Sequence, residues 1–232
     1  MPGEYMTIED AAKFLNMSEG AFKLLVEKGI SSRDKNGKVM VKTAEIREWL
    51  HRGIRYFDPD QLKVLESDYS GKSTRIAPLL DPRCIKMKLT GVTKTGVIAE
   101  LVDMLVERGG VDPKHRERVM TAVIERERMC STALADGVAI PHPREPLTGI
   151  IKKTRLVLGL SWRGIDLEAF DGQLTHVVVL LCTTRIDTHL QILASLTKLL
   201  RSMRLRVAMC RAKDEQAAID VLDAFEKQLH GS

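Results

Sequence analysis

Residues 126–144 read RERMCSTALADGVAIPHPR, and this stretch decides the fold of most of the chain. A helical pattern ends in its first letters, and the apolar run 138–140 has the length of a short buried strand. His142 follows that run, between Pro141 and Pro143. A proline fixes its own φ and favours extended backbone in the residue before it, so His142 has little backbone freedom. Such rigidity suits a side chain that must meet a reaction partner in one geometry.

Helical and strand-like patterns alternate on both sides of this stretch, from about Ile76 onward. They predict an amphipathic helix over residues 93–108 and a second helix that opens at Asp112-Pro113 and carries Arg126 at its end. Asp187 is expected to cap a long helix, which is followed by one more strand and a final helix. The strand-like runs are Val138–Ile140, Arg155–Leu160 and His176–Cys182. This alternation predicts an α/β domain with helices packed on a sheet.

Two further segments accompany the first, DLEAFDGQLTHVVVLL at 166–181 and DTHLQILASLTKLL at 187–200. In this order the three segments resemble the enzyme IIA domains of the phosphotransferase system, of the fructose, mannitol and nitrogen-regulatory type. The resemblance implies a mixed sheet flanked by helices. It also implies that His142 accepts a phosphoryl group from a histidine phosphocarrier protein, with His189 beside it and with Ser131 and Thr132 near the phosphate.

The residue types fit phosphoryl transfer on general chemical grounds. A neutral imidazole keeps a lone-pair nitrogen near pH 7, so His142 can attack phosphorus without first losing a proton. The negative charge on the transferred group calls for donors, which Arg126 and His189 can supply. No metal or cofactor is expected, and a zinc site of His142, His189 and Cys182 lacks ligand spacing. The catalytic candidates are His142, His189, Arg126, Ser131 and Thr132.

Each of these candidates also has a plainer interpretation. His142 could be a loop histidine whose ring is satisfied by the backbone, and His189 could lie on the surface near the start of a helix. The alternating charges of residues 125–128 are, taken alone, typical of a solvated helix end.

The first fifty residues predict a small, mainly helical module. Thr7 is placed to cap a first helix with Asp10 three residues later, and a second helix follows. The segment 33–41 has the pattern of a hairpin that turns at Asn36-Gly37, and a third helix is expected from Thr43. This order of elements is a winged helix-turn-helix outline.

YMTIEDAAKFLNMSEGAFKLLVEKG at 5–29 and KNGKVMVKTAEIREWL at 35–50 resemble the excisionase-like winged helix-turn-helix family. The resemblance implies a DNA-reading helix over 18–28 and a wing over 33–42 that touches the DNA backbone. The DNA-binding candidates are Ser18, Lys23, Arg33, Lys35, Lys38 and Lys42. A module that contacts protein and no longer reads DNA stays open as an alternative.

Residues 57–75 are predicted to be a linker, with a short helix at 59–66 and then a Ser/Gly-rich stretch. The expected organisation is a winged helix-turn-helix domain at 1–56 and an enzyme IIA-like domain at 76–230. The net charge of +5 is not concentrated in the first part, which holds ten Lys and Arg against nine Asp and Glu up to Asp58.

No run approaches the roughly 20 apolar residues that span a bilayer, and the N-terminus lacks an export signal, so we expect a cytoplasmic bacterial protein. The four cysteines have no paired short spacing and are expected to be reduced thiols.

Together these patterns predict a regulatory phosphocarrier coupled to transcription through a DNA-binding domain, with a homodimer as one form of the assembly. The alternative is a non-catalytic transcription factor that uses its larger domain as a sensor or docking module.

Overall fold

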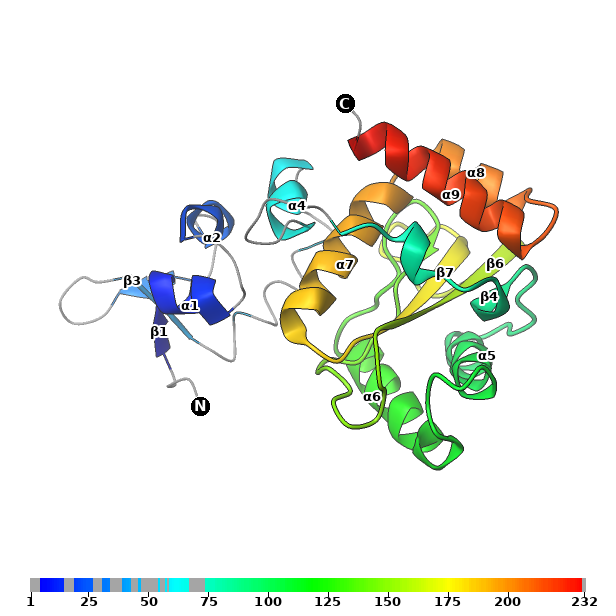
Figure 1. Ribbon diagram of the computed structural model, residues 1–232, viewed down its shortest axis with the longest axis horizontal. Helices are drawn as coiled ribbons and strands as arrows, with labels where there is room; N and C mark the ends of the chain where they lie inside the picture. The colour runs from blue at the N-terminus through cyan, green and yellow to red at the C-terminus, as the bar shows by residue number, and fades with distance from the viewer. Residues whose placement is uncertain are drawn as a thin grey trace.

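The larger part of the chain is built on a four-stranded sheet in the order β4-β6-β7-β5 (Figure 1). The computed structural model describes residues 5–14, 19–26, 31–33, 39–42, 46, 54, 57, 59–66 and 74–230. Strands β6 (Arg155–Ile165) and β7 (Thr175–Cys182) pair antiparallel in the middle of the sheet. The short strands β4 (Ile85–Lys86) and β5 (Val138–Ala139) each run parallel to their neighbour. The predicted mixed sheet flanked by helices is confirmed.

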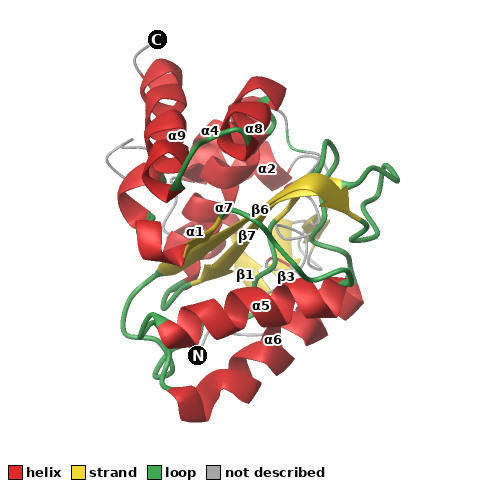
Figure 2. Ribbon diagram, turned by 90° about the vertical axis from the view of Figure 1, so that its right-hand side faces the viewer, coloured by secondary structure: helices red, strands yellow, loops and turns green. Residues whose placement is uncertain are grey.

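Both faces of this sheet are buried because its central strands are largely apolar. Successive side chains point to opposite faces of a strand, so Leu156 and Leu158 join one apolar cluster while Val157 joins the other. Helices on both sides cover these clusters, with α5 and α6 on one side and α7, α8 and α9 on the other (Figure 2). Their bounds are α5 Lys94–Glu107, α6 Arg116–Met129, α7 Ile186–Leu200, α8 Met203–Cys210 and α9 Glu215–His230.

The starts of the first two helices of this domain follow from their capping residues. The Thr93 hydroxyl accepts a hydrogen bond of 3.1 Å from the Gly96 amide at the start of α5. Asp112 caps a short 3-10 turn, Pro113–His115, that leads into α6. Both predicted helices are confirmed. The predicted long helix is present as α7, but the cap predicted at Asp187 is wrong, because the helix begins at Ile186 and Arg185 is its N-cap residue.

The prediction of a strand near the end of the chain is wrong, because the helix α8 occupies that position. The Ser202 hydroxyl accepts a hydrogen bond of 3.3 Å from the Leu205 amide and so caps this helix. Leu205 and Met209 are both fully buried. Their spacing of four residues places them on one helical face, which packs on β6 and β7.

The N-terminal region contains a three-stranded antiparallel sheet in the order β1-β3-β2. Its elements are β1 Tyr5–Thr7, α1 Ile8–Phe14, α2 Glu19–Val26, β2 Ser31–Arg33 and β3 Val39–Lys42. The predicted cap of α1 is confirmed, because the Thr7 hydroxyl accepts a hydrogen bond of 3.1 Å from the Asp10 amide. The predicted hairpin turn at Asn36-Gly37 lies outside the described residues. So does the helix expected from Thr43, except for the buried Ile46.

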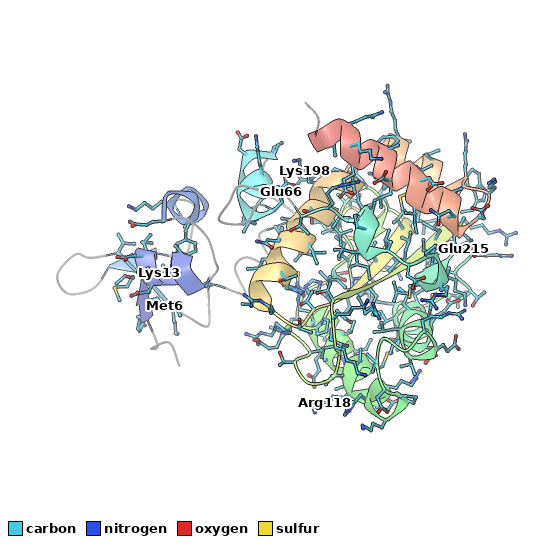
Figure 3. The ribbon with its side chains drawn as sticks, viewed as in Figure 1. Met6, Lys13, Glu66, Arg118, Lys198 and Glu215 are labelled. Atoms are coloured by element: carbon cyan, nitrogen blue, oxygen red, sulfur yellow. The ribbon has the colours of Figure 1, made fainter. Side chains whose placement is uncertain are left out.

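Helix α4 (Pro59–Glu66) confirms the short helix predicted between the two parts of the chain, and it lies against α7 (Figure 1). Leu62 and Leu65 are buried in this contact region. The Lys198 ammonium of α7 donates a hydrogen bond of 2.7 Å to the Glu66 carboxylate, and Figure 3 shows these two side chains next to each other.

Candidate functional site

Four elements of the larger domain bring the five catalytic candidates together. His142 lies in the loop after β5, and His189 lies in the first turn of α7. Arg126 is in the last turn of α6, and the loop that follows this helix carries Ser131 and Thr132. Arg126, Ser131, Thr132 and His142 line one cavity. His189 reaches the same place because its ring centroid is 5.0 Å from that of His142.

The imidazole of His142 is held in one tautomer by the backbone. Its Nδ1 lies 2.6 Å from the carbonyl oxygen of Ile140, and a carbonyl only accepts hydrogen bonds. Nδ1 therefore carries the proton, and Nε2 has the lone pair. The Leu181 amide of β7 donates a hydrogen bond of 2.9 Å to the Pro141 carbonyl, which ties this loop to the sheet. The ring is buried, with 3% of the residue exposed.

His189 packs edge-on against His142, at an interplanar angle of 60°. Its Nδ1 lies 3.1 Å from the hydroxyl oxygen of Thr183. Burial, together with the nearby charge of Arg126, lowers the pKa of His189 to about 3. His189 is therefore neutral at pH 7. With 2% of the residue exposed, its interpretation as a surface histidine is wrong.

Arg126 is also buried, with 4% of the residue exposed, so it does not belong to a solvated helix end. Its Nη1 donates a hydrogen bond of 2.8 Å to the carbonyl oxygen of Cys130. This bond fixes the guanidinium at the point where α6 ends and the Ser131-Thr132 loop begins. The guanidinium cation beside the two imidazole rings gives the cavity a positive character that suits an anionic group.

Glu127 organises the loop beside the two histidines, and the sequence analysis missed it. Its carboxylate accepts hydrogen bonds from the Thr132 amide at 3.0 Å, the Thr132 hydroxyl at 2.5 Å and the Ser131 hydroxyl at 2.9 Å. With 8% of the residue exposed, Glu127 is nearly buried. A carboxylate that accepts several hydrogen bonds in a buried place holds its donors firmly, so Glu127 fixes both hydroxyl residues.

Lys94, from the first turn of α5, neutralises this carboxylate. Its ammonium lies 3.2 Å from Glu127 and 2.9 Å from Glu168, and it donates a hydrogen bond of 3.3 Å to the Ser131 hydroxyl. Burial alone would lower the pKa of Lys94, but the hydrogen bonds and charges of Glu168 and Glu127 outweigh it and raise the pKa. Lys94 therefore stays charged at neutral pH.

The cavity itself is small, with a volume of about 20 Å³. Its wall includes Ile54, which precedes α4 in the chain and is 3% exposed. The other lining residues come from the larger domain and are Arg126, Cys130, Ser131, Thr132, Leu134, Ile140, His142, Leu193 and Thr197.

Three of the six DNA-binding candidates, Ser18, Lys35 and Lys38, lie outside the described residues. Lys23 is exposed on α2 and forms an ion pair of 2.6 Å with Glu19, one helical turn before it. Arg33 is the last residue of β2, and Lys42 ends β3.

The larger domain of the chain matches a known protein family. The family described as "Phosphoenolpyruvate-dependent sugar phosphotransferase system, EIIA 2" matches residues 78–224. The chain belongs to this EIIA family. The match covers the whole sheet and all five catalytic candidates.

Relatives of the EIIA domain occur both inside larger proteins and as single domains. The fructose-specific EIIABC component of Bacillus subtilis is 32% identical over 155 residues, which are 66% of this chain and 24% of that protein. A nitrogen regulatory protein of Bradyrhizobium diazoefficiens is 31% identical over 152 residues, which are 63% of this chain and 94% of that protein. This chain therefore spans about a quarter of the first relative and nearly all of the second.

Solved structures share the fold of the EIIA domain. The nitrogen regulatory protein IIA-Ntr of Neisseria meningitidis superposes with a TM-score of 0.56 at 20% identity, over 63% of this chain and 97% of that one. The mannitol IIA of Escherichia coli superposes with a TM-score of 0.53 at 23% identity, over 62% of this chain and 98% of that one. Among the described residues, no helix is both long and apolar enough to span a membrane.

Proposed function

We propose that the EIIA domain is a phosphocarrier that accepts a phosphoryl group on Nε2 of His142. The hydrogen bond from Nδ1 to the Ile140 carbonyl carries this proposal, because it leaves the lone pair on Nε2. In the transfer, this lone pair forms a new P–N bond while the P–N bond of a phosphohistidine on the donor breaks. The donor's imidazole nitrogen keeps the electron pair of the broken bond, and the Nδ1 proton stays on His142.

The neighbours of His142 have proposed roles in stabilising the travelling group. We assign the Thr183 hydroxyl as the donor to Nδ1 of His189. Nε2 of His189 then carries the proton and can donate a hydrogen bond to a phosphoryl oxygen. Arg126 has guanidinium donors besides the one bonded to Cys130, and its charge offsets that of the phosphoryl oxygens. Ser131 and Thr132 supply hydroxyls at the rim.

A phosphotransfer assay tests the role of His142. The chain is incubated with a phosphorylated histidine phosphocarrier protein, and the modified peptide is mapped by mass spectrometry. We expect a single adduct on His142 that is labile in acid and stable in alkali, and no adduct in His142→Gln. His115→Gln changes a histidine outside the site and should be labelled like the parent. Label that survives in His142→Gln would contradict the proposal.

We also propose that residues 1–56 form an excisionase-like winged helix-turn-helix domain that couples this phosphocarrier to transcription. Two short helices followed by the antiparallel pair β2 and β3 support this proposal. The proposed partners are a histidine phosphocarrier protein and DNA, and the proposed location is the cytoplasm. Nitrogen regulation is the proposed process, since two relatives of nearly single-domain length are nitrogen regulatory proteins, although a third is a fructose-specific EIIA component. The remaining alternative is a non-catalytic transcription factor, which the phosphotransfer assay tests directly.

A further inference from the structure

Part of the wall of the cavity at His142 comes from Ile54, a residue that precedes the EIIA domain. Of the described residues that line this cavity, Ile54 alone comes from before Thr74. Ile54 and Phe57 are both buried, with 3% and 6% of each residue exposed. The carbonyl oxygen of Ile54 accepts a hydrogen bond of 3.4 Å from the Phe57 amide. We call the described residues Ile54, Phe57 and Pro59–Glu66 the strap.

Polar contacts on α7 and at its C-terminal end hold the strap in place. The Arg201 guanidinium donates a hydrogen bond of 2.9 Å to the carbonyl oxygen of Phe57. The Lys198 ammonium donates one of 2.7 Å to Glu66, whose side chain is only 2% exposed (Figure 3). A buried carboxylate is strongly destabilised when its partner is removed, so this pair makes the position of the strap depend on Lys198.

The covered cavity leaves no room for a phosphoryl group. Its volume of about 20 Å³ is enough for about one water molecule. A phosphoryl group on Nε2 adds a phosphorus and three oxygens, and its donor must also approach from the opposite side of the phosphorus. Nε2 of His142 is buried in this arrangement. A phosphoryl group on Nε2 therefore needs space that the wall of the cavity, which includes Ile54, now fills.

We infer that the strap is an autoinhibitory segment: it covers His142 in the unphosphorylated chain, and the strap and a phosphoryl group exclude each other from the same cavity. The inference rests on the proposed phosphocarrier function for its physiological meaning. Whether the strap limits access to His142 is a separate question that does not depend on that function. Because coupling between two binding events is reciprocal, a strap that opposes the phosphoryl group is opposed by that group to the same degree.

Chemical modification of His142 tests the cover without a phosphoryl donor. Diethyl pyrocarbonate transfers an ethoxycarbonyl group to a neutral imidazole nitrogen and releases ethanol and carbon dioxide. A buried histidine reacts only when its cover opens, so the rate of modification follows the open fraction. The rate is measured at His142 by peptide mapping, in the full chain, for Ile54→Ser and Lys198→Met. We expect His142 to react about tenfold faster in both variants, which corresponds to a tenfold larger open fraction.

Three controls separate opening of the strap from general loosening. Lys213→Met removes an exposed lysine between α8 and α9 and should keep the parent rate at His142. His176, which is half-buried in β7, should react at the parent rate in every variant. The double variant Glu66→Lys with Lys198→Glu restores opposite charges and should return the rate toward that of the parent.

The same variants are then assayed for phosphotransfer from a phosphorylated carrier. Faster modification together with faster phosphotransfer supports the inference. Equal modification rates at His142 in the parent, Ile54→Ser and Lys198→Met would overturn it. Faster modification without phosphotransfer in any chain would uphold the cover and overturn the proposed phosphocarrier function instead.

Discussion

At the scale of single residues, Arg126 and His189 are expected to speed transfer without carrying the phosphoryl group. Arg126→Ala and His189→Ala each remove a hydrogen bond to a charged group, so each should slow single-turnover transfer by about tenfold to a hundredfold. Arg128→Ala changes the exposed arginine two residues further along α6 and should transfer at the parent rate. Parent rates in both site variants would contradict their proposed roles.

Burial of His189 also predicts a dependence of stability on pH. Its pKa falls from 6.5 to about 3 in the folded chain, because burial disfavours the charged ring. Below about pH 6.5 the unfolded chain therefore binds a proton that the folded chain does not. This contribution to stability is intact above that pH and decreases as the pH falls toward 3.

Below about pH 6.5, we expect this group to lower the free energy of unfolding by about 1.4 kcal/mol for each unit by which the pH falls. Urea unfolding at pH 7, 6 and 5 measures the slope. His189→Gln cannot take up the proton, so its stability should fall less steeply with decreasing pH. Equal slopes in the two proteins would show that His189 is not buried as a neutral ring.

Glu127 is expected to act by positioning the Ser131-Thr132 loop. In Glu127→Gln one of the carboxylate oxygens becomes an amide group, so at least one of the hydroxyl or amide donors loses its acceptor. We expect a loss of about 1 to 3 kcal/mol in the free energy of unfolding, together with slower phosphotransfer. Glu125→Gln alters an exposed carboxylate on the same helix and serves as the control. The prediction fails if both variants unfold and transfer alike.

The sequence locates His142 better than Glu127 for a physical reason. Two prolines mark His142 directly, because they restrict its backbone whatever surrounds it. The alternating charges Glu125 to Arg128, by contrast, do not say which side of the helix faces inward. That depends on Lys94, thirty-odd residues earlier, which lies 3.2 Å from Glu127. Contacts between distant segments of this kind are not encoded in local spacing.

At the scale of secondary structure, the sequence predicts the long strands and the long helices correctly, but it predicts a strand where the structure has the helix α8. The apolar residues of β6 and β7 alternate between two clusters, and the helix predicted over residues 93–108 is present as α5, capped by Thr93. The segment Met203–Cys210 is short, and its apolar residues are compatible with a strand or a helix. The Ser202 hydroxyl favours the helix, because it accepts a hydrogen bond from the Leu205 amide at the helix start.

Removal of this cap should therefore weaken α8. Ser202→Ala leaves the Leu205 amide without its side-chain acceptor, and we expect a loss of about 1 kcal/mol in the free energy of unfolding. Ser202→Asn keeps an acceptor at the same position and should restore most of the stability. Urea unfolding of the three proteins measures both differences. Equal stability of Ser202→Ala and the parent would contradict this account of the helix start.

At the scale of the whole molecule, the strap joins the chemistry of His142 to the N-terminal region. A phosphoryl group brings a charge of about −1.5 to −2 to the cavity, if it resembles other phosphorylated side chains. It also takes the place of Ile54 in the proposed mechanism. The added negative charge repels the phosphates of DNA, so it acts against DNA binding. We therefore expect phosphorylation to weaken DNA affinity.

A DNA titration at two salt concentrations tests this coupling with unmodified and phosphorylated protein. The logarithm of the affinity should fall with the logarithm of salt concentration, with a slope of about −0.9 per phosphate contact. Lys35→Glu with Lys38→Glu should weaken binding and reduce that slope. His142→Gln treated with the same donor should bind like unmodified protein, because it has no acceptor. Absence of DNA affinity at low salt would favour a protein-binding N-terminal module. Equal affinity of the phosphorylated and unmodified chains would instead remove the coupling, while leaving the cover over His142 to be judged by its own modification rate.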